Sequence, residues 1–161
     1  MKIRLLYPAL LVALTIQAVL ASGQQVIIQD EGGKQTILTR ADLEALARVK
    51  VTAGASNSSA TFEGVSLDSV LEKAGVGLGE TMKGKRMASY LLVEAADGYR
   101  VVFALAEIDP AFSDKRVILA FLKDGKALDA KEGPYRIVVP DEKRMARWVR
   151  QLTTLKIVAA P

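Results

Sequence analysis

The sequence predicts an α+β domain with a mixed, largely antiparallel sheet and three or four short helices. Runs of aliphatic and β-branched residues alternate with glycine-containing turns, and a few short segments show the helical spacing of apolar residues. The chain has 161 residues, of which 50% are hydrophobic and 25% are charged. This length and composition suit one packed domain of ordinary size.

The first residues have the layout of a secretory signal peptide. Lys2 and Arg4 precede an almost uncharged run over 5–20, and small residues follow that run. Cleavage after Ala21 or after Gly23 would leave a small residue next to the cut, and the sequence does not decide between the two bonds.

We therefore expect a signal peptide over residues 1–23, a single domain over 24–161, and a periplasmic or secreted protein. The alternative is an uncleaved membrane anchor, although an apolar run of about 16 residues is short for a span that needs roughly 20. After cleavage we expect no membrane-spanning segment.

The β-prone segments expected to form strands are, in chain order, 26–29, 35–38, 50–53, 90–95, 99–105, 117–122, 137–139 and 155–158. Two glycines in the turn over 30–34 and Asp-Gly at 97–98 predict hairpins at both places. A third hairpin is expected at 123–126, and a small polar surface loop at 54–60. The strands between 90 and 122 should form the heart of the sheet.

Capping residues indicate where the first two helices begin. Thr39 precedes Asp42 by three residues, which is a capping pattern, and the helix that follows is expected to end near Val49. Ser66 is expected to cap a second helix, and Gly75 lies where a left-handed C-terminal cap is expected.

A last helix is expected after Pro140, with Asp141 as its cap, because apolar residues recur at helical spacing at Met145, Trp148, Val149 and Leu152. At ~100° per residue, Lys143, Arg147 and Arg150 fall together on one face of this helix. Such a face is either an ordinary solvated surface or an anion-binding site, and the residues alone leave both interpretations open.

The composition excludes several kinds of chemistry. The chain contains no cysteine and no histidine, so disulfides, thiolate ligands and histidine bases are excluded. No Ser-x-x-Lys segment is present, and carboxylate pairs such as Asp141-Glu142 are interpreted as capping or solvated groups. A net charge of +4 is too mild to indicate a nucleic-acid partner. We therefore assign no catalytic residue and no metal ligand.

Three ordered stretches resemble the oxidoreductase molybdopterin-binding domain family, whose best-known members are sulfite oxidases. The first is FEGVSL at 62–67, similar to the family's aromatic-x-Gly-Val-x-Leu entry into a helix. The second is ADGY at 96–99, followed by VILAF at 117–121 and DGKAL at 124–128. The third is EGPYRIVVP at 132–140, which leads to RWV at 147–149.

The resemblance implies a sulfite oxidase-like fold and a cofactor pocket. Arg136 and Arg147 match the positions of the family's Arg and Lys that face the pterin and its phosphate. With Tyr99 and Lys143 they form the predicted set of ligand-binding residues.

The enzymes of that family also hold molybdenum through one cysteine that precedes the aromatic-Gly-Val motif. In this chain the corresponding region, 49–60, offers only hydroxyl and amide groups such as Ser58, which match the metal less well than a thiolate. Whether any molybdopterin binds is left open.

The leading hypothesis is a non-catalytic, exported protein that binds a small anionic ligand or a protein partner in the degenerate cofactor pocket, with no nucleic acid involved. One alternative is a molybdopterin-dependent oxidoreductase in which oxygen from Ser56, Ser58 or water replaces the thiolate. Another is an accessory subunit of a membrane redox system.

Overall fold

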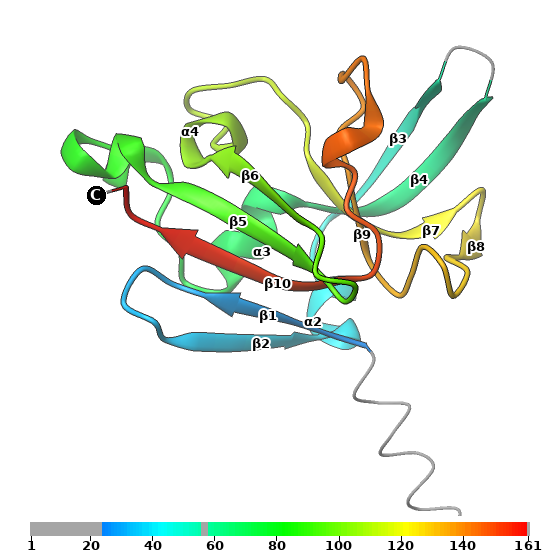
Figure 1. Cartoon of the computed structure of the whole chain (residues 1–161), viewed down its shortest axis with the longest axis horizontal. Helices are drawn as coiled ribbons and strands as arrows, with labels where there is room; N and C mark the ends of the chain where they lie inside the picture. Colours follow the sequence, from blue (N-terminus) through cyan, green and yellow to red (C-terminus); the bar gives the residue numbers. More distant parts are fainter. Residues whose placement is uncertain (1–23, 56–57, 161) are drawn as a thin grey trace, which may run out of the picture.

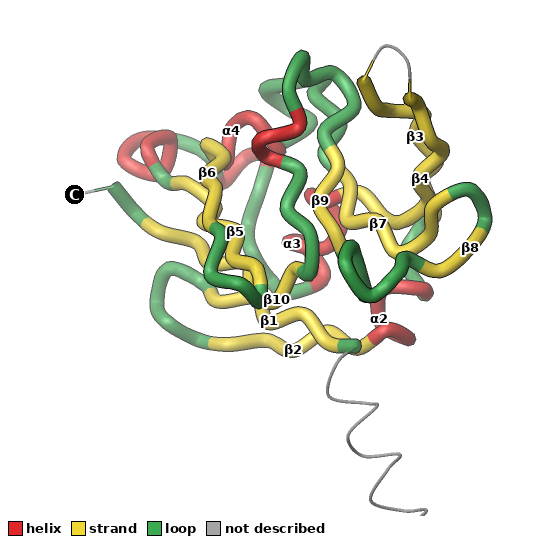
Figure 2. The backbone as a smooth tube through the Cα atoms, turned by 45° about the vertical axis from the view of Figure 1, so that its right-hand side comes forward, coloured by secondary structure: helices red, strands yellow, loops and turns green. Residues whose placement is uncertain are grey.

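The computed structural model describes residues 24–55 and 58–160, which fold into two β-sheets with short helices around them (Figure 1). The tube in Figure 2 shows that strands dominate and that long loops connect them. The predicted α+β class with largely antiparallel pairing is confirmed, but the strands between 90 and 122, expected to form the heart of one sheet, are divided between the two sheets. No helix among the described residues is long and apolar enough to cross a membrane.

The first sheet has the strand order β2-β1-β10-β5-β6. Its strands are β1 (Gln25–Gln29), β2 (Gln35–Thr39), β5 (Tyr90–Ala95), β6 (Arg100–Ala104) and β10 (Leu152–Val158). β1 pairs in parallel with β10, whereas the other pairs are antiparallel. The two predicted hairpins, β1–β2 and β5–β6, therefore lie on either side of the last strand.

The second sheet has the order β3-β4-β7-β8, and β9 pairs with the start of β7 on the edge opposite β4, which it shares with β8. Its strands are β3 (Arg48–Ala55), β4 (Ser58–Ser66), β7 (Ile118–Lys123), β8 (Lys126–Ala127) and β9 (Arg136–Val138). The predicted hairpin at 123–126 is confirmed as the β7–β8 turn. The expectation of a surface loop at 54–60 is wrong for most of that range. The pairing of β3 with β4 continues there, with Gly54 opposite Ser59 and Ala55 opposite Ser58. Ser56 and Asn57 lie outside the described residues.

The helices are short: α2 (Arg40–Glu44), α3 (Leu67–Lys73), α4 (Leu105–Ile108), and 3-10 turns at Gly79–Thr81, Gly84–Ala88 and Met145–Arg147. The capping box of Thr39 and Asp42 is confirmed at the start of α2. This helix ends earlier than predicted, because the chain enters β3 at Arg48.

The second predicted helix is confirmed as α3, and Gly75 follows it with a φ of 85°, the left-handed conformation expected of its cap. Ser66 is the N-cap residue, but its hydroxyl donates to Ser69 Oγ at 2.8 Å and makes no capping bond to the backbone.

The prediction of a helix after Pro140 is wrong. Only a single 3-10 turn forms at Met145–Arg147, and the following backbone pairs with distant residues. Ile137 N donates to Val149 O at 2.8 Å, and Leu152 N donates to Tyr135 O at 2.9 Å. Trp148, Val149 and Leu152 are buried along this irregular path and Met145 is exposed, so their helical spacing does not reflect a helix.

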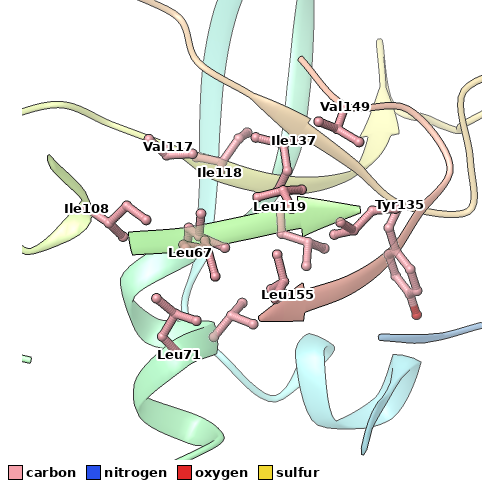
Figure 3. Packing of buried hydrophobic residues seen from close by; sticks show 14 of the residues in the cluster. Leu67, Leu71, Ile108, Val117, Ile118, Leu119, Tyr135, Ile137, Val149 and Leu155 are labelled. Carbon is pink, nitrogen blue, oxygen red and sulfur yellow. The ribbon is translucent and has the colours of Figure 1, made fainter. Parts of the chain in front are cut away.

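The hydrophobic core lies between the two sheets and is completed by α3 (Figure 3). Leu67 and Leu71 of α3 face Leu119 of β7 and Leu155 of β10, and all four side chains are buried. Because one core joins both sheets, groups that face each other across the sheets are held in fixed positions.

Candidate ligand-binding cavity

A cavity of about 510 Å³ opens between the ends of the two sheets, a volume that suits a small-molecule site. The β3–β4 hairpin forms one wall, the β5–β6 turn another, and the chain from Glu132 to Arg150 a third. The residues that line it are Ala53, Gly54, Ser58, Ala60, Phe62, Ala95, Asp97, Tyr99, Lys123, Glu132, Arg136, Met145, Ala146, Trp148 and Arg150.

Arg136, the first residue of β9, is only 6% exposed and lines this cavity. Its Nη1 donates to Glu132 Oε1 at 2.7 Å, so its charge is compensated within the wall. The guanidinium carbon lies 5.1 Å from the Phe62 ring centroid and 5.6 Å from that of Trp148, which is the geometry of cation–π contacts. The buried Nε has no hydrogen-bond partner among the described residues.

Phe62 and Trp148 form the aromatic part of the wall. Their rings meet edge to face, with centroids 5.7 Å apart and planes at 90°. The indole Nε1 donates to Val139 O at 3.0 Å, which fixes the ring and satisfies its buried donor. This wall is therefore rigid.

Tyr99 lies at the rim of the cavity and is 49% exposed. Its backbone N–H donates to Asp97 Oδ1 at 3.0 Å within the β5–β6 turn. Its hydroxyl donates to Ala146 O at 2.6 Å. This bond connects the turn to the segment that replaces the predicted helix.

The charged lining carries one positive charge in excess, since three cations and two carboxylates contribute to it. Lys123 Nζ lies 3.3 Å from Glu132 Oε1, so Glu132 interacts with both Lys123 and Arg136. Arg150 is exposed and forms no ion pair with any described residue. Arg150 is thus the cation most available to a ligand.

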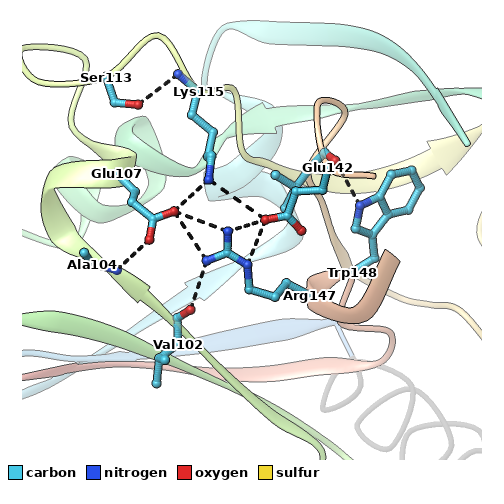
Figure 4. Close-up of polar contacts among 9 residues, drawn as sticks. Val102, Ala104, Glu107, Ser113, Lys115, Glu142, Arg147 and Trp148 are labelled. Carbon is cyan, nitrogen blue, oxygen red and sulfur yellow. Dashed lines mark hydrogen bonds and ion pairs between the residues drawn. The ribbon is translucent and has the colours of Figure 1, made fainter. Parts of the chain in front are cut away.

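Arg147 lies outside the cavity lining and belongs to a separate ionic cluster (Figure 4). Its Nε donates to Glu142 Oε1 at 2.8 Å and its Nη2 to Glu107 Oε2 at 3.3 Å. Lys115 Nζ also lies 2.8 Å from Glu107 Oε2. Arg147 is therefore occupied in holding its segment against α4.

The pKa values of this cluster follow from its contacts. Burial raises the pKa of the Glu107 carboxyl, but hydrogen bonds from Lys115 and Arg147 and their charges outweigh it and hold the pKa below its ordinary value. Burial lowers the pKa of Arg147, but its bonds to Glu142 and Glu107 outweigh this and raise it. Both groups are charged in the folded protein.

The structure thus places Arg136 and Tyr99 of the predicted set at one cavity, with Arg147 and Lys143 elsewhere. Lys143 is exposed, does not line the cavity and makes no ion pair within the described part of the chain. The face that was expected to join Lys143, Arg147 and Arg150 does not exist, because the helix does not form.

Sequence reasoning missed the roles of Lys123, Glu132 and Phe62. Phe62 and Glu132 lie within the motifs that carry the family resemblance, and their place in those motifs could have indicated a role at the site. Their grouping with Lys123 depends on the pairing of β4 with β7, which no local pattern reveals.

The donors in the cavity do not fit a metal held by a thiolate. The β3–β4 wall, within the region where the resemblance implies a cysteine, contributes Ala53, Gly54, Ser58 and Ala60. Glu132 is already bound to two cations. No group of three His, Cys, Asp or Glu residues able to hold a metal exists in residues 24–55 and 58–160. The described residues of the cavity therefore provide no ligand set for such a metal.

Comparison with known proteins finds similarity to a family model and to solved structures. A family model described as the oxidoreductase molybdopterin binding domain matches residues 38–161. The sulfane dehydrogenase SoxCD from Paracoccus pantotrophus has a similar solved structure, with a TM-score of 0.65 and 23% sequence identity over 84% of this chain and 38% of that one. The chain thus spans well under half of that protein, and the likeness concerns the fold. No curated protein sequence matches.

Proposed function

Because this chain belongs to the oxidoreductase molybdopterin binding domain family, we propose that it is an exported, non-catalytic member that binds a small anionic ligand in the cavity between its two sheets. The observation that carries the proposal is a cavity of small-molecule size with a positively charged excess and no cysteine thiolate. A ligand bound there would be held by charge and shape, and no described residue is placed to transform it.

The non-catalytic role is supported by the state of the acidic and basic groups around the cavity. Glu132 is paired with two cations and Asp97 accepts a backbone hydrogen bond in its turn. A general acid or base must be free to reach the reacting group, and both carboxylates are already bound by neighbouring groups of the cavity wall.

Export is proposed from the signal-peptide layout of residues 1–23. Mass determination of the protein isolated from its native host, with N-terminal sequencing, tests it. We expect a chain that begins at Ser22 or Gln24. A chain that retains residues 1–20 would contradict cleavage.

The ligand is tested by purifying the exported protein from its native host and analysing it by native mass spectrometry and elemental analysis. We expect a small anion that is lost on denaturation, and less than stoichiometric molybdenum. The Arg150→Gln variant should carry less of the anion, whereas Arg144→Gln, at an exposed arginine outside the cavity lining, should carry the same amount. Stoichiometric molybdenum with turnover of an oxidisable substrate would contradict the proposal and favour the molybdopterin enzyme with an oxygen ligand.

A protein partner is the second candidate, favoured by exposed apolar surface at the cavity mouth. Tyr99 and Met145 both line the cavity and are each 49% exposed. This arrangement suits the docking of a partner's side chain or an accessory role beside a redox protein. Co-purification of one partner that is lost in Met145→Glu but retained in Arg150→Gln would favour it over a small ligand.

A further inference from the structure

We infer that the cavity selects a small aromatic monoanion, such as an aromatic carboxylate, over a phosphate dianion of the same size. This inference rests on the proposed function, because it specifies the ligand of the same cavity. The charged groups and the aromatic rings that line the cavity support it.

Some of the charges that line the cavity are paired with one another. Arg136 and Lys123 share the carboxylate of Glu132, at N–O distances of 2.7 Å and 3.3 Å. These three groups together carry one positive charge, Arg150 adds a second without an ion-pair partner among the described residues, and Asp97 adds one negative charge, so the lining has a net charge of +1. A second negative charge on a ligand would exceed this net charge and would approach the carboxylates of Glu132 and Asp97, which disfavours it.

The geometry of Arg150 suits a carboxylate. An arginine donates two parallel N–H bonds to the two oxygens of one carboxylate, and it loses little solvation in doing so at an exposed position. Arg136, by contrast, is buried against the rings of Phe62 and Trp148 and already donates to Glu132, so it acts on a ligand mainly through its charge.

The aromatic lining of the cavity favours a ligand that itself contains an aromatic ring. Trp148 and Phe62 present a fixed apolar wall, and Tyr99 and Met145 lie exposed at the opening. Aromatic rings and a methionine thioether pack favourably against a flat aromatic ligand. A cavity of about 510 Å³ accommodates a ligand of one or two rings.

The experiment uses Trp148, which is the single tryptophan of the chain and lines the cavity, so its fluorescence reports on occupancy. The full-length exported protein is titrated at pH 8 with benzoate, phenyl phosphate and benzyl alcohol, and each Kd is checked by calorimetry. We expect benzoate to bind at least about tenfold more tightly than either of the others.

Two variants test the role of Arg150. Arg150→Gln should weaken benzoate binding about tenfold and abolish the preference over benzyl alcohol, whereas Arg144→Gln should leave both unchanged. Equal urea midpoints for the three proteins show that each is folded.

Tighter binding of phenyl phosphate than of benzoate would overturn the inference while leaving an anion site in place. Equal binding of benzoate and benzyl alcohol would overturn it by removing the charge requirement. Absence of saturable binding for all three probes would also overturn it, and the anion found by native mass spectrometry would then decide the proposed function separately.

Discussion

Arg147 and Glu107 are 40 positions apart in the sequence, yet Arg147 Nη2 lies 3.3 Å from Glu107 Oε2. The same guanidinium binds Glu142 and donates to Val102 O at 3.2 Å. One side chain therefore ties the segment after β9 to α4 and to β6, and keeps that segment in place beside the cavity.

Removing this cation should loosen the segment. Arg147→Gln leaves Lys115 as the one cation of the cluster beside Glu107 and Glu142 and should reduce the free energy of unfolding by about 1–2 kcal/mol. Urea denaturation measures the change. Lys143→Gln is the matched control, because Lys143 is exposed without an ion pair in the described residues, and it should change stability by less than about 0.5 kcal/mol. Equal losses for the two variants would contradict the role of Arg147.

The stability contributed by Glu107 should depend on pH. Its folded pKa lies below the ordinary value of 4.5, so the carboxylate stabilises the fold above that pH. This contribution should fall away as the pH drops through the folded pKa, because the carboxyl then protonates in both states.

The measurement compares unfolding of the wild type and Glu107→Gln from pH 7 to pH 3. The wild type should be more stable at pH 7, and the difference should shrink below about pH 4.5. Glu80→Gln, at an exposed carboxylate without an ion pair in residues 24–55 and 58–160, should show no such trend. A constant difference across the range would refute the linkage.

Tyr99→Phe should release the segment at the cavity rim. It removes the hydroxyl that donates to Ala146 O at 2.6 Å and should cost about 0.5–1 kcal/mol, because Tyr99 is half exposed and water can replace the bond. Amide hydrogen exchange should quicken over 145–147. Tyr90→Phe is the control, since the Tyr90 hydroxyl has no hydrogen-bond partner in the described structure, and it should leave that exchange unchanged.

Gly64→Ala should disrupt the second sheet. A Cβ at this position would lie 2.0 Å from Leu119 O and 2.7 Å from Ala120 Cα, both backbone atoms of β7 that cannot move independently of the sheet. We expect a loss of about 3 kcal/mol or more, or no folded protein. Gly32→Ala, whose Cβ would meet only the side chain of Asp30 at 3.3 Å, should cost less than about 1 kcal/mol. Circular dichroism and urea unfolding compare them.

The parts of the fold that were predictable depend on local chemistry. Asp97-Gly98 predicted the β5–β6 hairpin because the turn requires a residue with positive φ, and Gly98 has a φ of 83°. Thr39 with Asp42 predicted the start of α2 because both groups of the capping box lie within one turn. Such features need no knowledge of the rest of the chain.

The segment after Pro140 was not predictable in the same way. Its apolar spacing is common to a helix and to an irregular chain that buries the same residues. Hydrogen bonds from Trp148 Nε1 to Val139 O and from Leu152 N to Tyr135 O, together with the ion pair of Arg147 to Glu107, favour the irregular path. These partners are specified by tertiary structure.

The candidate site was likewise predictable only in part. Arg136 and Tyr99 were predicted from the family resemblance and line the cavity. Arg147 was predicted from the same motif but its side chain is bound by a carboxylate of α4, and nothing near it in sequence indicates that partner. The pairing of Lys123 with Glu132 likewise depends on the turn after β8.

β10 follows the other strands of the described residues along the chain, yet it is the middle strand of its sheet, between β1 and β5. A chain delivered from its N-terminus, by a ribosome or through a secretion channel, therefore releases both flanking hairpins before the strand that joins them. Until Leu152–Val158 emerges, facing edges of β1 and β5 remain unpaired and open to association with other chains. Completion of this sheet is thus delayed until β10 emerges, and a chaperone that shields strand edges would act during that interval.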